Sequence, residues 1–328
     1  MIQLIKSGIG IKFLQRRNLI LAVWVIAFAI PLFDRNPYHI DVLVTTGIYM
    51  LLALGLNVIV GYAGILNLGF AALYACGAYS YALLNLSLGV PFWMGLPIAA
   101  FVTAVFGILL ALPALRLSGD YIAIVTLGAG EIVRIALNNL DPVTGGPNGL
   151  MGIDHPTIVR YDFSVRSEPY YFLVLALLAC TVFCMRRLES SRLGRSWMAL
   201  REDELAAVSM GVDPAWAKLS AFGIAGFIAG AAGAVFAAKQ GTVSPDSFDF
   251  VVSIMVLAMV VLGGLGNIYG VLLGSLILGI LPEFLRGFEV YRMLIFGVAM
   301  VVIMLFRPQG ILGDTRRQLW VGRERRRK

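Results

Sequence analysis

The stretch VLVTTGIYMLLALGLNVIVGYAGILNLG, residues 42–69, decides the fold class. It contains no charged residue, and its first part, residues 42–60, approaches the roughly 20 apolar residues that a helix needs to cross a bilayer core. Glycines and asparagines then follow at short intervals, where an uninterrupted helix would not need them. The stretch therefore predicts a membrane-spanning helix followed by a glycine-rich break.

Similar apolar stretches recur along the chain. Of the 328 residues, 59% are hydrophobic and only 14% are charged, and the mean hydropathy is +0.85. Soluble domains carry nearly twice that share of charge. The sequence thus predicts an all-α integral membrane protein, a single domain over residues 1–328 with about ten transmembrane helices. The predicted spans are 19–33, 42–60, 66–86, 92–112, 121–138, 170–185, 219–238, 251–265, 271–285 and 293–306.

The basic residues predict the orientation of these spans. With the N-terminus inside the cell, most of the 26 Lys and Arg residues fall on the cytoplasmic side, as the positive-inside rule requires. Both termini are then cytoplasmic, and residues 307–328 form a basic cytoplasmic tail. The two longest hydrophilic loops lie on opposite sides, residues 139–169 outside and residues 186–218 inside.

Several function classes lack the residues they need. The cysteines Cys76, Cys180 and Cys184 lie in apolar segments, and His39 and His155 are the only histidines, so neither a metal site nor a disulfide framework is expected. Membrane orientation explains the net charge of +7 better than nucleic acid binding does. No lysine follows a glycine, so the phosphate-binding loop of ATPases is absent.

The inner loop contains SRLGRSWMALREDELAAVSMG, residues 191–211, which predicts one short amphipathic helix over residues 192–211. Its predicted apolar positions are Trp197, Met198, Leu200, Leu205, Val208 and Met210. Such a helix could lie on the inner leaflet, which favours Lys and Arg, or dock on a soluble partner. Because Glu202, Asp203 and Glu204 make the polar face mixed or acidic, the partner interpretation is favoured.

A second glycine-rich break occurs at VLGGLGNIYG, residues 261–270, and its glycines match the spacing of the first. Unpaired backbone groups in hydrocarbon are costly, so a break is expected at a pathway or in the protein interior. The alternative is that the glycines only allow close helix packing. The candidate pathway residues are Asn57, Gly61, Gly64, Asn67, Gly69, Gly263, Gly266 and Asn267.

Glu131 and Arg134 are charged residues inside the predicted span 121–138. At a spacing of three residues they can face each other across one helical turn. They are further pathway candidates, because intramembrane charges face the bundle interior or water. The favoured alternative is a structural ion pair.

The inner loop resembles the Glu-Ala-Ala-x-x-x-Gly coupling motif of ABC-importer permeases, matched by Ala206, Ala207 and Gly211. Leu205 stands at the Glu position, and the acid lies one residue earlier, at Glu204. Residues 61–84, 119–128, 144–149, 254–270 and 307–310 together resemble the LivM-type permeases of branched-chain amino acid ABC importers.

This resemblance implies a multi-pass protein of the bacterial inner membrane that forms half of a translocation pathway for Leu, Ile or Val. The implied partners are an H-type permease, two cytoplasmic ATPase subunits that hold ATP and Mg²⁺, and a periplasmic binding protein. This chain itself would bind no cofactor and be no enzyme. The alternatives are a urea or short-amide ABC permease and, less favoured, an ion-coupled secondary transporter, in which Glu131 would be the candidate acid.

The resemblance also suggests which residues meet the partners. The expected contacts with the ATPases are Arg201, Glu202, Asp203, Glu204, Ala206, Ala207 and Gly211. The expected docking residues for the binding protein, in the periplasmic loop 139–169, are Thr144, Gly145, Gly146 and Asn148.

Overall fold

The computed structural model describes residues 36–115, 117, 119–158, 161–163 and 168–284, together with Gly297 and residues 310–312. The predicted spans 19–33 and, apart from Gly297, 293–306 lie outside this part of the chain, as does most of the tail 307–328. The placement of the termini therefore stays a prediction.

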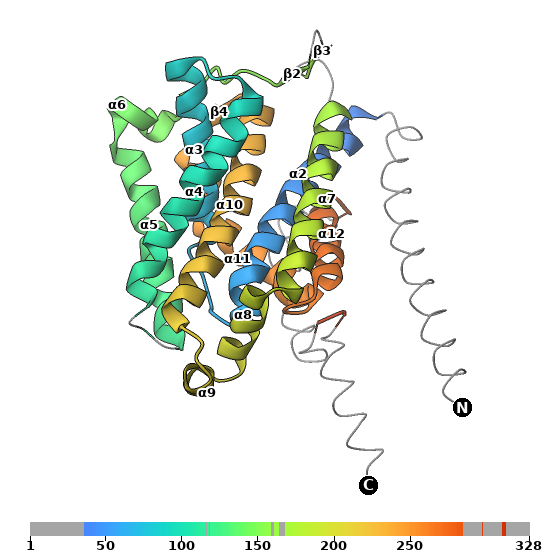
Figure 1. Cartoon of the computed structure of the whole chain (residues 1–328). Helices are drawn as coiled ribbons and strands as arrows, with labels where there is room; N and C mark the ends of the chain where they lie inside the picture. Colours follow the sequence, from blue (N-terminus) through green and yellow to red (C-terminus); the bar gives the residue numbers. More distant parts are fainter. Residues whose placement is uncertain are drawn as a thin grey trace, which may run out of the picture.

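The described residues form a bundle of helices (Figure 1). The longer helices are α2 (Pro37–Leu56), α3 (Phe70–Leu88), α4 (Phe92–Ala114), α5 (Asp120–Asn139), α7 (Glu168–Ser190), α8 (Arg192–Glu202), α10 (Pro214–Gln240), α11 (Phe250–Gly263) and α12 (Ile268–Phe284). The short helices are α6 (Asp141–Thr144), α9 (Glu204–Ser209), the π-helix η1 (Asn57–Tyr62) and the 3₁₀ turns η2 (Gly146–Asn148) and η3 (Pro245–Phe248). Two antiparallel pairs of short strands join β1 (Leu150–Met151) to β4 (Thr242–Val243) and β2 (Thr157–Ile158) to β3 (Tyr161–Asp162).

Six helical segments among the described residues are long and apolar enough to cross a membrane. They are Pro37–Tyr62, Phe92–Ala114, Tyr121–Asn139, Glu168–Ser190, Pro214–Gln240 and Pro245–Gly263. Each matches a predicted span, so the helical membrane class is confirmed, whereas the total of about ten spans is not tested. The predicted span 66–86 begins late, at Phe70, because residues 63–69 leave the helical path after η1.

Helix α10 lies at the centre of the bundle, between α3 and α4 on one side and α2 on the other (Figure 1). Its glycines allow backbones to touch: a Cβ at Gly226 would lie 2.6 Å from the carbonyl oxygen of Thr103, and one at Gly233 would lie 2.5 Å from that of Tyr74. Small residues serve this purpose in membrane helices, where close van der Waals contact drives association. Most of α10 is consequently buried.

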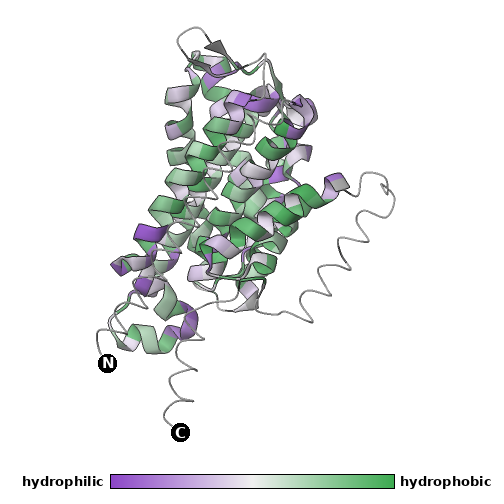
Figure 2. Ribbon diagram, turned by 90° about the vertical axis from the view of Figure 1, so that its right-hand side faces the viewer, coloured by the Kyte–Doolittle hydropathy of each residue, from purple (hydrophilic) through white to green (hydrophobic). Residues whose placement is uncertain are grey.

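Hydrophobic residues occupy the middle of the bundle, and hydrophilic ones gather toward its ends (Figure 2). At one end, α8 and α9 project from the bundle, whereas the paired strands and α6 lie at the other end (Figure 1). The two longest hydrophilic loops therefore lie at opposite ends, as the sequence predicts.

Candidate coupling and pathway site

The predicted single helix over residues 192–211 is wrong, because the segment folds as two helices, α8 and α9. The break is at Asp203, whose backbone is extended, with φ −160° and ψ 115°. Its carboxylate accepts a hydrogen bond from the backbone N–H of Ala206 at 3.0 Å and so caps α9. Aspartate is among the best residues at this position, and the cap competes with a continuous helix.

Trp197 anchors α8 to the bundle. Its side chain is fully buried, and its indole Nε1 donates to the carbonyl oxygen of Ala217 at 3.0 Å and to Oγ of Ser220 at 3.1 Å. Both acceptors belong to the first turns of α10. The helix α8 therefore cannot move without pulling on α10 or breaking these bonds.

An ion pair attaches α9 to the start of α10. Lys218 of α10 has a side chain only 4% exposed, and its Nζ lies 2.8 Å from Oε1 of Glu204, which is 42% exposed. Glu204 thus turns toward the bundle, although its predicted role in contacts with a partner stays untested. Sequence reasoning missed Lys218, since its partner is 14 residues away on another helix.

Other apolar side chains of this segment point away from the protein. Leu205 is 81% and Met210 85% exposed, Val208 is also exposed, and so is the neighbouring Trp216 at the start of α10. The predicted apolar stripe is thus divided by the turn at Asp203: Trp197 and Leu200 of α8 are buried in the bundle, whereas Leu205 and Val208 of α9 and the following Met210 are exposed. We call Leu205, Val208, Met210 and Trp216 the apolar knob. Among the other coupling candidates, Glu202, Asp203, Ala206 and Gly211 are exposed, and Ala207 is buried.

The first predicted break begins with a π-helix, η1, at the end of α2. Such single-turn π-helices carry an extra residue per turn and often mark functional sites. The chain then leaves the helix, and Gly64 adopts φ +72°, which favours glycine. The predicted interruption after residue 60 is thus confirmed.

The two predicted breaks, far apart in sequence, touch each other. Asn57 is fully buried, and its Oδ1 accepts a hydrogen bond from the backbone N–H of Gly266 at 2.9 Å. A Cβ at Gly61 would lie 2.6 Å from that same nitrogen. The glycines therefore allow the backbones to meet, and whether a substrate passes here stays a prediction.

Arg201, from the last turn of α8, reaches this contact. Its guanidinium donates a hydrogen bond to the carbonyl oxygen of Gly61. Its stem lies on Gly64, where a Cβ would be 2.7 Å from Cγ of Arg201. A Cβ at Gly266 would lie 3.0 Å from the Nη1 atom of Arg201. We call the contact of Asn57, Gly61, Gly266 and Arg201 the inner junction.

Residues 310–312 complete the second break. The backbone N–H groups of Ile311 and Leu312 donate to the carbonyl oxygens of Leu262 (2.8 Å) and Gly263 (3.2 Å), which the end of α11 leaves free. Asn267 donates from Nδ2 to the carbonyl of Leu312, and its Oδ1 caps the start of α12. The freed backbone groups are thus paired within the protein.

Asn67 and Gly69 have local contacts at the start of α3. Oδ1 of Asn67 accepts from the N–H of Gly69 at 2.9 Å. A Cβ at Gly69 would lie 1.9 Å from the carbonyl oxygen of Thr126, so α3 and α5 touch here through backbone. These contacts give both residues a structural use, and their predicted role in the pathway stays untested.

Glu131 and Arg134 form the predicted ion pair, with Nη2 of Arg134 2.9 Å from Oε2 of Glu131. Both side chains are partly exposed on α5. One helical turn thus balances both charges.

The predicted docking residues lie in a tight turn at the opposite end of the bundle. Thr144 is buried, and its Oγ1 donates to the carbonyl of Leu137 at 2.6 Å, which closes the end of α5. Gly145 and Gly146 both have positive φ, and a Cβ at Gly145 would lie 2.2 Å from the carbonyl of Gly149. Asn148 is exposed. The described residues contain no group of three or more potential metal ligands.

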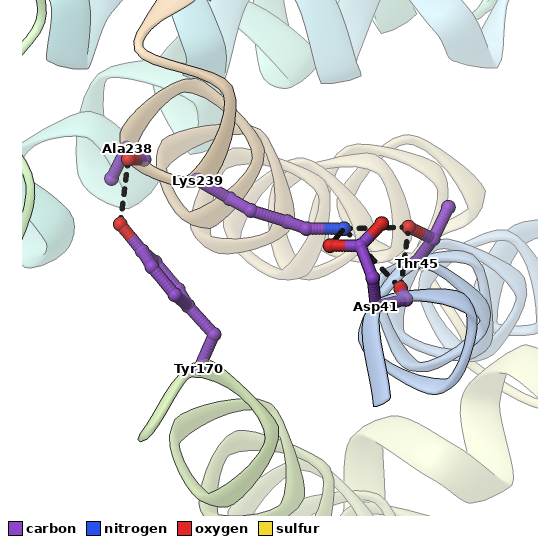
Figure 3. A network of polar contacts seen from close by, with 5 residues as sticks. All are labelled: Asp41, Thr45, Tyr170, Ala238 and Lys239. Atoms are coloured by element: carbon purple, nitrogen blue, oxygen red, sulfur yellow. Dashed lines mark hydrogen bonds and ion pairs between the residues drawn. The ribbon is translucent and has the colours of Figure 1, made fainter. Parts of the chain in front are cut away.

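Sequence reasoning also missed a polar network near this end (Figure 3). Nζ of Lys239, at the end of α10, lies 2.9 Å from Oδ1 of Asp41 in α2 and donates to Oγ1 of Thr45 at 2.7 Å. The hydroxyl of Tyr170, in α7, donates to the carbonyl of Ala238 at 2.7 Å. Lys239 and Asp41 stood just outside the predicted spans, so nothing marked them as charges within the bundle.

The chain is similar to known transport proteins over nearly its whole length. A family model described as branched-chain amino acid transport system / permease component matches residues 38–304. The high-affinity branched-chain amino acid transport system permease protein LivM of Salmonella typhimurium is 46% identical over 93% of this chain and 77% of its own. LivM of Escherichia coli is 44% identical over 96% and 81%. A probable permease LivH of Methanocaldococcus jannaschii is 26% identical over 83% and 90%. No solved structure matches the chain.

Proposed function

Because the chain belongs to the branched-chain amino acid transport permease family, we propose that it is a transmembrane subunit of an ATP-driven importer for Leu, Ile and Val. It would lie in the bacterial inner membrane and form half of the translocation pathway. A related H-type permease would supply the other half. Two cytoplasmic ATPases would hydrolyse ATP, and a periplasmic binding protein would deliver the substrate.

The observation that carries this proposal is the construction of α8 and α9. The segment is held to the bundle by Trp197, Arg201 and Glu204. Its apolar knob nevertheless faces away from the bundle. Exposed apolar side chains on a segment that is bonded to the bundle can dock in an apolar groove of a partner protein. Burial of Leu205 and Met210 in such a groove would stabilise the complex. An ATPase docked on the apolar knob would move α8 and α9, and with them α10 and the inner junction.

Transport with purified components tests the proposal. The chain is purified with the products of neighbouring transport genes, reconstituted in vesicles and supplied with ATP on the ATPase side. We expect uptake of labelled leucine that requires both ATP and the binding protein. Uptake by this chain alone, driven by an ion gradient, would instead identify a secondary transporter. Titration of the binding protein with leucine, valine and urea separates the amino acid importer from an amide importer.

The apolar knob gives a second test of the same proposal. The double substitution Leu205→Asp with Met210→Asp introduces two negative charges into the apolar knob. Both positions are exposed, so the fold of the chain should tolerate the charges. We expect the ATPases to stop copurifying while the chain still enters the membrane. Met151→Asp is the matched control, because Met151 is equally apolar and exposed but lies in β1 at the other end. Unchanged copurification of the double variant would rule out docking at the knob.

A further inference from the structure

The inner junction joins three parts of the chain at one point: the π-helix after α2, the turn between α11 and α12, and the end of α8. The chain leaves the helical path just after η1, so carbonyl groups there need partners from elsewhere. Arg201 supplies one, at Gly61. A hydrogen bond from a charged guanidinium is stronger than one between neutral groups.

The glycines make room for this side chain. Any Cβ at Gly64 or Gly266 would lie within 3.0 Å of Arg201 atoms. The guanidinium therefore lies between the two breaks and touches both. A shorter side chain at this position could not reach from α8 to the carbonyl of Gly61 and the backbone of Gly266 together.

Arg201 is also mechanically linked to the anchor of α8. Trp197 and Arg201 are four residues apart and so lie on the same side of the helix. Trp197 holds α10, and Arg201 holds the first break. A tilt of α8 about Trp197 would therefore displace Arg201 from Gly61 while α8 stays attached to α10.

The inner junction leaves one hydrogen-bond donor unused. Nδ2 of Asn57 is buried and has no partner among the described residues. Buried polar groups are nearly always paired, and those that are not often belong to functional sites. The Asn57 amide would gain a partner if water or a substrate acceptor group entered between the breaks.

We propose that Arg201 is a positioning residue that holds the two helix breaks together at the cytoplasmic end of the pathway and releases them when α8 moves. The proposal rests on the proposed transport function, in which a motor drives α8. With Arg201 on Gly61 the inner junction is closed, as in this structure. With Arg201 withdrawn, the bond between Asn57 and Gly266 alone holds the breaks, and they separate and open the pathway to the cytoplasm when it also breaks.

A cysteine reporter on the π-helix tests the release directly. Val60 is only 8% exposed in the closed arrangement. Val60→Cys is placed in a chain whose native Cys76, Cys180 and Cys184 are replaced by alanine, within the assembled transporter. A membrane-impermeant maleimide is then applied from the cytoplasmic side. We expect Arg201→Ala to raise the labelling rate by roughly tenfold, the change expected for loss of one charge-assisted hydrogen bond.

Arg195→Ala is the matched control. Arg195 also belongs to α8, but among the described residues its guanidinium donates to the carbonyl of Ser190, away from the breaks. We expect Arg195→Ala to label like the parent. Leucine uptake should fall in Arg201→Ala, because the lost guanidinium bonds the carbonyl oxygen of Gly61 at the inner junction. Equal labelling in the two variants would overturn the proposal.

Arg201→Lys keeps the test decisive if Arg201→Ala does not assemble. Lysine keeps a donor for Gly61 but lacks the planar guanidinium whose Nη1 lies against both Gly61 and Gly266, so labelling should be intermediate. Labelling like that of the parent would again overturn the proposal. The labelling of Val60→Cys does not depend on the substrate, so the two proposals can fail separately. Failure of ATP-dependent uptake in the parent counts against the proposed function. A labelling rate that Arg201→Ala leaves unchanged counts against the role of Arg201.

Discussion

A lysine at each end of α10 forms an ion pair with a neighbouring helix. Lys218, at its start, is almost completely buried, and a cation in such a place must be paired. Glu204 provides the pair from α9, which is why this acid turns toward the bundle although the sequence places it in an acidic run. Lys239, at the other end, is paired with Asp41 of α2 (Figure 3).

The Lys218 pair yields a prediction about stability. Removing one partner of a buried ion pair leaves an uncompensated charge and costs about 3–5 kcal/mol, which the partial exposure of Glu204 should reduce. We expect Glu204→Gln to lower the thermal unfolding midpoint of the purified chain by several degrees. Glu202→Gln, at an exposed neighbour, should leave the midpoint unchanged. Adding Lys218→Met to Glu204→Gln should restore most of the loss, and a failure to do so would contradict the assigned pairing.

At the scale of elements, α3 and α10 pack through direct backbone contact. Helix α3 meets α10 where Gly77 faces Gly230, and a Cβ at Gly77 would lie 2.5 Å from Cα of Gly230. Lipid tails are as apolar as leucine, so membrane helices gain little from burying apolar surface and must fit closely instead.

Gly77→Ala should therefore destabilise the bundle. The added methyl group meets backbone atoms that cannot rotate away, and overpacking of this kind costs about 1–3 kcal/mol. Gly128→Ala in α5 is the control, because a Cβ there meets nothing within 4 Å among the described residues and alanine favours the helix. Fluorescence-detected size-exclusion chromatography after graded heating compares the two variants. If Gly77→Ala survives heating as well as Gly128→Ala, the assigned α3–α10 contact is wrong.

At the scale of the whole molecule, α10 connects two polar ends of the bundle. Trp197 and Glu204 hold its first turns, and Asp41 and Tyr170 hold its last. A single 27-residue helix therefore links the contacts with α8 and α9 at one end to those with α2 and α7 at the other.

This arrangement predicts which residues face each side of the membrane. Leu205→Cys, in the apolar knob, should react with an impermeant maleimide only from the cytoplasm. Met151→Cys, in the strand β1, should react only from the outside. Intact cells and inside-out vesicles, with the native cysteines replaced, give the two measurements. Reaction of Leu205→Cys in intact cells would reverse the orientation and remove the basis for coupling to cytoplasmic ATPases.

The sequence by itself determined the membrane class, the described spans to within a few residues, and both helix breaks, because hydropathy and glycine spacing are local properties of the chain. It also placed Glu131 beside Arg134, since one helical turn relates them. Only the tertiary structure decided that the helix predicted over residues 192–211 is two helices, that Lys218 and Glu204 form a pair, and that Arg201 bonds the carbonyl oxygen of Gly61. These features depend on contacts between residues far apart in sequence, such as Arg201 and Gly61, and no local pattern encodes which distant backbone group a side chain will meet.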